Sequence, residues 1–192
     1  MPILVRANLH YEAAQPCEFL LQIEAATCPS QRCVRSTFAL TPDLDSHLIE
    51  GQGGIGSRRW IEETKIFMCR YEATFEVDRV QPPLAQLAAA KVSQTPSQVT
   101  QYLLPSRYCH PEAFFDFLSQ HFKELSGGAL VCALCKWISE NFKYDPFASI
   151  GTTTATESYA RRAGVCRDYA HVLITMLRAS AIPARYVSVY AP

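Results

Sequence analysis

The strongest constraint on the fold is a change of hydrophobic period along the chain. Residues 60–78 alternate between apolar and polar side chains, which predicts a strand with one buried face. One face carries Phe67, Cys69, Tyr71, Ala73, Phe75 and Val77, and the other carries Met68, Arg70, Glu72, Thr74 and Glu76. Residues 17–26 and 34–40 are shorter strand candidates, separated by turn-rich sequence. We therefore expect an N-terminal antiparallel β domain over residues 1–100.

Residues 81–107 separate this region from the next. The segment is rich in Pro, Gln, Ser and Thr, and its prolines interrupt any long regular element. After it, apolar residues recur at helical spacing, and residues 129–142 place Leu130, Leu134, Ile138 and Phe142 on one stripe. The sequence predicts helices over residues 111–125, 129–142, 152–162 and 166–181, and a strand over 184–191. An α+β fold follows, with a second domain over residues 101–192.

The helix predicted over residues 166–181 is the most strongly patterned. Tyr169 or Ala170, Leu173, Ile174 and Leu177 form its expected core face. Pro183 cannot continue a helix, so the helix is expected to end before it.

Charge and composition exclude several partners. Lys and Arg together number 18, equal to Asp and Glu, so the net field favours neither nucleic acid nor an anionic membrane. No run of roughly 20 apolar residues and no signal-peptide pattern is present, which predicts a cytoplasmic location. The eight cysteines are then expected to be reduced, most of them acting as small apolar side chains.

Three motifs are weak candidates for cofactor or metal sites. The glycines of GQGGIG (51–56) lead into a strand, whereas a dinucleotide site needs a helix there, so we expect a loop between strands. Cys132 and Cys135 lie in mid-helix, where core packing is expected and not zinc binding. The isolated histidines lack ligand spacing. No cofactor and no metal are predicted.

Cys166 differs from the other cysteines by its position. Gly164 permits a turn just before it, and an apolar helix begins just after it. The sulfur is thus expected near unpaired amides and the positive end of the helix dipole, which favour a thiolate and could hold an oxyanion. A buried, inert thiol at a helix start remains the alternative from the local pattern.

Neither nearby ionisable residue fits as a direct partner of Cys166. His171 lies about 140° round the helix from Cys166, and Asp168 about 200°. His171 is expected instead to bury one ring nitrogen in a hydrogen bond between packed elements.

These segments resemble the bacterial transglutaminase-like superfamily, which includes proteins described as cysteine proteases. The resemblance rests on YLLPSRYC (102–109), WISENFKYD (137–145), GVCRDYAH (164–171) and IPARYV (182–187). One departure from the family pattern is Val189, where relatives commonly carry Gly. It implies a β-rich domain followed by a papain-like, transglutaminase-like core, with Cys166 as the catalytic nucleophile. In the family, a His and an Asp on later strands complete the triad. The sequence ends at Pro192 before either, so we expect a truncated form that is inactive alone.

The expected function is thiol-dependent acyl transfer on peptide or glutamine amides through a Cys166 thioester, with a protein or peptide as substrate. The alternatives are a non-catalytic protein-interaction module that keeps the fold, and a redox sensor that uses Cys166. If residues 185–190 form a strand with an open edge, a homo-oligomer through that edge is also expected.

Overall fold

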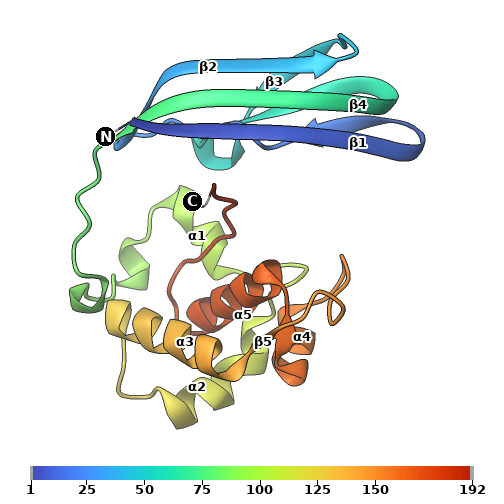
Figure 1. Ribbon diagram of the computed structural model, residues 1–192. Coiled ribbons are helices and arrows are strands. Elements are labelled where there is room, and N and C mark those ends of the chain that lie inside the picture. The colour runs from blue at the N-terminus through green and yellow to red at the C-terminus, as the bar shows by residue number, and fades with distance from the viewer. Residues whose placement is uncertain (1, 191–192) are drawn as a thin grey trace. The chain divides into compact units, whose positions relative to one another are not determined.

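The computed structural model describes residues 2–190 and divides into two compact units. The first unit, here the β unit, comprises Met1–Val80 with Val189–Pro192, and the second, the helical unit, comprises Gln81–Ser188 (Figure 1). The division after residue 80 differs from the boundary at residue 100 expected from composition. Residues 81–100 belong to the helical unit because they contact it, as described below.

The β unit is a four-stranded antiparallel sheet formed by β1 (Pro2–Leu21), β2 (Gln31–Thr41), β3 (Ser46–Glu50) and β4 (Ser57–Val77). Strand β4 is central, because β1 pairs with one of its edges and β2 and β3 pair with the other. The alternation seen in the sequence is confirmed: Phe67, Cys69, Tyr71, Ala73 and Phe75 are buried, and Val77 is partly buried. The GQGGIG segment joins β3 to β4, as expected for a loop between strands.

Strand β1 begins fifteen residues earlier than the predicted strand at residue 17. Its register against β4 places Val5 opposite Ala73 and Tyr11 opposite Phe67, so its apolar residues extend the same buried face. On the other face, Arg6 donates to Glu72 across the two strands at 2.9 Å. The register shifts after Glu12, which divides β1 into two stretches, and only the second was foreseen.

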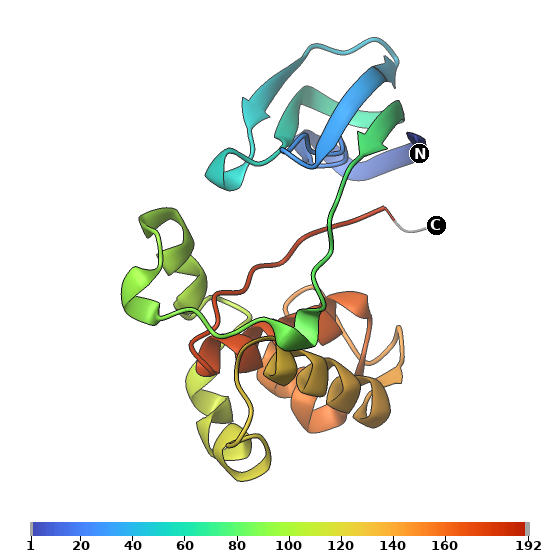
Figure 2. The same ribbon diagram turned by 90° about the vertical axis from the view of Figure 1, so that its left-hand side faces the viewer.

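The helical unit contains five α-helices within its described residues (Figure 2). They are α1 (Ser97–Thr100), α2 (Phe115–His121), α3 (Gly127–Asn141), α4 (Ala155–Arg161) and α5 (Cys166–Ala179), together with short 3-10 turns and the two-residue parallel strands β5 (Lys143–Tyr144) and β6 (Ala163–Gly164). None of the described helices combines the length and the apolar character needed to cross a bilayer.

The core of the helical unit lies between α3 and α5. It contains Phe114, Leu118, Leu130, Leu134, Ile138, Ala155, Val172, Met176 and Leu177. The predicted stripe on α3 is confirmed for Leu130, Leu134 and Ile138, and Phe142 packs against the cluster. The core face predicted for α5 is confirmed for Ile174 and Leu177, which are buried, but it missed the fully buried Val172 and Met176. The polar residues Asp168, His171 and Thr175 are buried as well.

The first turns of the helical unit dock on the start of α3 through main-chain atoms. The amide of Gly128 donates to the carbonyl of Leu87 at 2.8 Å. A Cβ on Gly128 would collide with the main-chain carbonyl of Leu84, so only glycine permits this approach. This contact explains why residues 81–100 group with the helices.

The strand predicted over residues 184–191 is wrong for its described part, since residues 184–190 form no strand. Within the described chain, no other strand pairs with this segment. The start of the segment is instead held at Ala184. Arg178 donates to the Ala184 carbonyl through Nε at 3.0 Å and Nη2 at 2.8 Å. The amide of Ala184 donates to the Tyr102 carbonyl at 3.1 Å. β-branched residues such as Val187 and Val189 favour a strand, but a strand also needs a neighbouring strand to pair with.

We predict that Gly128→Ala lowers the free energy of unfolding by roughly 2–4 kcal/mol, because the added Cβ displaces the main chain at Leu84. Urea denaturation followed by circular dichroism measures the change. Gly151→Ala is the matched control, since a Cβ there meets nothing within 4 Å. Equal stability of both variants would contradict the docking role of Gly128.

Candidate active site

Cys166 is the first residue of α5, and its side chain is exposed. The chain leaves β6 at Gly164, passes Val165 in an extended conformation and turns directly into the helix. Cys166 therefore lies where the sequence placed it, at a helix start. The alternative of a thiol buried in the core does not describe its surroundings.

The main-chain amides at the start of α5 set the local electrostatics. The carbonyl of Val165 accepts from the amides of Asp168 at 2.9 Å and Tyr169 at 3.2 Å. The first amides of a helix, here those of Cys166 and Arg167, have no carbonyl one turn back to receive their hydrogen bonds. They contribute the positive end of the helix dipole, which stabilises negative charge within the first turn.

Asp168 fixes this helix start. Its side chain is fully buried, and its Oδ2 accepts the amide of Val165 at 2.8 Å. A Cβ at position 164 would lie 2.6 Å from Oδ2, so Gly164 is needed for the carboxylate to fold back over the preceding residue. Helix geometry excludes Asp168 as a direct partner of Cys166, but the hydrogen bond of its carboxylate to the Val165 amide was not expected from the sequence. The signal was present: an acidic residue three positions after a helix N-cap.

Burial acts to raise the pKa of Asp168, but the hydrogen bonds from the Val165 amide, Ser149 and Arg167, with the charge of Arg167, bring the pKa below its ordinary value. The carboxyl group is therefore ionised in the folded protein near neutral pH. The negative charge is buried and held by donors on three sides.

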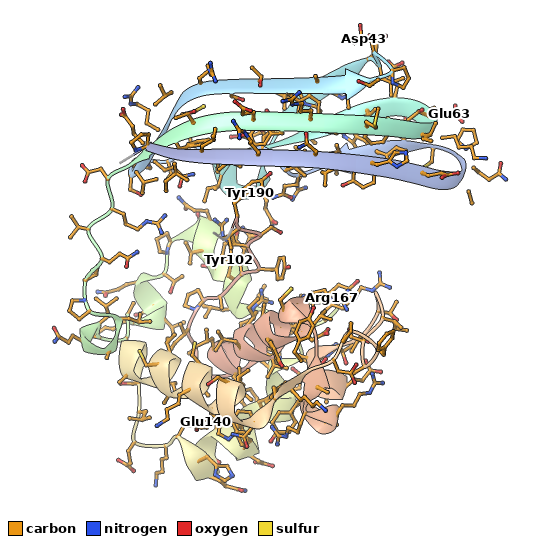
Figure 3. All side chains as sticks on the ribbon, viewed as in Figure 1. Asp43, Glu63, Tyr102, Glu140, Arg167 and Tyr190 are labelled. Atoms are coloured by element: carbon orange, nitrogen blue, oxygen red, sulfur yellow. The ribbon has the colours of Figure 1, made fainter. Side chains whose placement is uncertain are left out.

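Arg167 connects the helix start to the loop between β5 and α4. Its Nη2 donates to the carbonyl of Ile150 and to Ser149 Oγ, each at 2.7 Å, and lies 3.3 Å from Asp168 Oδ1 (Figure 3). Because Arg167 directly follows Cys166, these hydrogen bonds attach the loop to the residue next to the thiol.

His171 is buried away from the exposed thiol. Its ring stacks on Tyr108 with centroids 5.0 Å apart and contacts Tyr186 at 5.7 Å. The sequence predicted a hydrogen bond for a buried ring nitrogen, but the buried Nδ1 has no partner. The ring is held instead by its aromatic neighbours. Burial, and then the positive charges of Arg167 and Arg178, lower the pKa of His171 against the opposing effect of Asp168, so the ring is neutral at pH 7.

The C-x-x-C pair of α3 was expected in the core, and that expectation is wrong. Cys132 and Cys135 are both exposed, because the buried stripe of α3 follows Leu130, Leu134 and Ile138 and leaves the cysteines on the outer side. Within residues 2–190, no three His, Cys, Asp or Glu side chains gather in a way that could hold a metal ion.

A cavity of about 330 Å³ lies elsewhere in the helical unit. Residues of α2, the start of α3 and the last turn of α5 line it, including Phe115, Leu118, Leu130 and Ala179. Cys166, at the opposite end of α5, is not among its lining residues. The exposed thiol of Cys166 is thus separate from this cavity.

Comparison with known proteins shows what this chain is similar to. Residues 118–192 match the family model of the transglutaminase-like superfamily core. This chain also aligns with the crystal structure of a Cytophaga hutchinsonii protein named "Putative Cysteine Protease", with a TM-score of 0.84 and 24% sequence identity over 95% of this chain and 67% of the other. An uncharacterized protein of Mycobacterium leprae (strain TN) is 33% identical over 60 residues, which are 31% of this chain and 22% of that protein.

The family match is confined to residues 118–192, whereas the fold similarity to the Cytophaga hutchinsonii structure extends over 95% of this chain, which therefore has the same α+β fold. The resemblance seen in the sequence is confirmed at this level. The chain spans less than a quarter of the length of the mycobacterial protein that it matches.

Asp168→Asn is expected to lower the free energy of unfolding by about 1–3 kcal/mol at pH 7, because a buried charge-assisted hydrogen bond to the Val165 amide is weakened. Asp116→Asn, at an exposed carboxyl group of α2, is the matched control. Since folding lowers the pKa of Asp168, its stabilisation is complete above the unfolded value of about 3.9 and is lost as the pH falls through the lower folded value. Denaturation curves between pH 7 and 3 measure both effects, and a pH-independent difference would contradict them.

The buried, neutral ring of His171 gives a second pH dependence. Because folding lowers its pKa, the unfolded chain takes up a proton first, and stability falls as the pH drops below the unfolded value of about 6.5. His171→Phe keeps a ring against Tyr108 and is expected to flatten the decline in melting temperature between pH 7 and 5. His121→Phe, at an exposed histidine, should leave the decline in place. If the melting temperature of His171→Phe declines with falling pH as steeply as that of the wild type, His171 is not the source of this pH dependence.

Proposed function

We propose that Cys166 is the nucleophile of a thiol-dependent acyl transfer on peptide or glutamine amides. The observation that carries the proposal is an exposed thiol on the first residue of α5, at the positive end of that helix. The superfamily match and the name of the Cytophaga hutchinsonii protein support a cysteine-protease-like activity. Hydrolysis is the favoured outcome, because no residue marks a site for an acceptor amine.

The reaction has two balanced steps. The sulfur of Cys166 attacks the amide carbonyl carbon, the C–S bond forms, the C–N bond breaks, and the leaving amine takes up the proton released by the thiol. Water then attacks the thioester, which releases the carboxylic acid and restores the thiol. In both steps, negative charge develops on the carbonyl oxygen, and the free amides at the start of α5 are suited to stabilise it.

His171 is not proposed as the general base. Its ring is packed between Tyr108 and Tyr186, and it lies about 140° round α5 from Cys166. The resemblance implies a separate His and Asp for that role. The decisive test therefore measures the attack by sulfur itself and does not require turnover.

Alkylation by iodoacetamide, followed by peptide mass spectrometry from pH 5 to 10, tests the proposal. We expect Cys166 to react at least about tenfold faster at pH 7 than Cys132, which is exposed in mid-helix and serves as an internal reference. An activated peptide ester should also leave an acyl adduct on the wild type and none on Cys166→Ser.

Equal rates at Cys166 and Cys132 across this pH range would defeat the proposal. That outcome would favour the alternative, a protein-interaction module that keeps the fold without nucleophilic chemistry. A peroxide-induced disulfide at Cys166 would point instead to a redox sensor.

A further inference from the structure

The loop between β5 and α4 exposes large apolar side chains beside the candidate nucleophile. Phe147 is 94% exposed, Ile150 70% and Tyr144, at the end of β5, 61%. Single exposed apolar residues are ordinary on protein surfaces, but three within seven residues form a patch. The loop is referred to below as the 144–150 loop.

The main-chain amides of the 144–150 loop donate hydrogen bonds to acceptors in the loop and beside it. The amide of Asp145 donates to the carbonyl of Gly164 at 3.0 Å, which continues the pairing of β5 with β6. The amide of Phe147 donates to Asp145 Oδ1 at 2.9 Å, and that of Ile150 to Thr153 Oγ1 at 3.0 Å. The exposure of Phe147 is thus a property of a folded turn.

Two arginines from neighbouring helices also fix the loop. Arg161, in the last turn of α4, donates to the carbonyl of Ala148 at 2.7 Å. Arg167, in the first turn of α5, donates to the carbonyl of Ile150 and to Ser149. The loop is therefore tied to the residue that follows Cys166.

The loop is also tied to the residues that precede Cys166. Tyr144 pairs with Gly164, two residues before the thiol. Gly164 before Cys166 and Arg167 after it thus both contact the loop, which places the loop next to the start of α5.

We propose that the 144–150 loop, with Phe147 at its centre, binds an apolar side chain of the polypeptide whose amide is attacked by Cys166. The inference rests on the proposed function and names its substrate class: peptides with an aromatic or branched aliphatic residue next to the reacting amide. Remote contacts of this kind position the carbonyl group for attack.

The size and charge of the patch favour this occupant. Three such side chains expose on the order of 400 Å², about half of the roughly 800 Å² that each partner contributes to a stable protein interface. A second copy of the chain would need a larger surface. The segment YDPFASI itself contains no lysine or arginine, and the neighbouring Arg161 and Arg167 are hydrogen-bonded to its carbonyls, whereas surfaces that bind lipid usually carry several free basic residues. An area of this order suits a peptide substrate better than the surface of a folded protein.

Two peptidyl chloromethyl ketones test the inference, one with phenylalanine and one with glycine at the residue beside the electrophile. In each reaction the Cys166 sulfur displaces chloride, so labelling is read directly by intact mass. We expect the wild type to react about tenfold faster with the phenylalanine reagent. Phe147→Ala should reduce this ratio to about one, and Phe115→Ala, at an exposed phenylalanine of α2, should retain it.

Iodoacetamide separates failure of this inference from failure of the proposed function. If iodoacetamide does not single out Cys166, the proposed function and the inference both fall. If Cys166 is singled out but the phenylalanine preference is absent, or survives in Phe147→Ala, only the inference is overturned. Self-association or binding to phosphatidylcholine vesicles that is lost in Phe147→Ala would also overturn it, in favour of a second copy or a lipid surface.

Discussion

The buried carboxylate of Asp168 is the contact on which the candidate site depends. It accepts the amide of Val165, and it can do so only because residue 164 has no side chain. A buried carboxylate without donors would be costly, so the amide, Ser149 and Arg167 are each part of keeping it there. Together they determine where the helix begins, and the first residue of that helix is Cys166.

The same contact links the site to the rest of the helical unit. Arg167 is shared between Asp168 and the 144–150 loop, and α5 itself packs on α3 through Val172, Met176 and Leu177. The exposed end of α5 is thus held by polar contacts, and its other turns by apolar packing. This division suits a nucleophile, which must be reached by substrate yet keep a fixed position.

Sequence patterns were sufficient to predict the helices and strands that bury one face. The alternation in β4 and the stripe on α3 mark burial directly, because each period follows from backbone geometry. The position of Cys166 at a helix start was also readable, since Gly164 and the apolar run define it.

The sequence was misleading where burial depends on polar or main-chain contacts. Asp168 is buried because a backbone amide faces it, and residues 81–100 join the helices through the carbonyls of Leu84 and Leu87. Neither contact leaves a hydrophobic period to detect. Their mid-helix position predicts that Cys132 and Cys135 lie on the apolar face of α3, but their angular position on the helix leaves both exposed. The segment 184–190 has strand-forming residues without a paired neighbour.

The manner in which the 144–150 loop is attached has one further consequence. Apart from the hydroxyl group of Ser149, the arginine contacts to this loop end on main-chain carbonyls, those of Ala148 and Ile150. A carbonyl is supplied by any amino acid, so the side chains at positions 147 and 150 can be exchanged without loosening the attachment. The surface that this loop presents to solvent is therefore decoupled from the contacts that hold the start of α5.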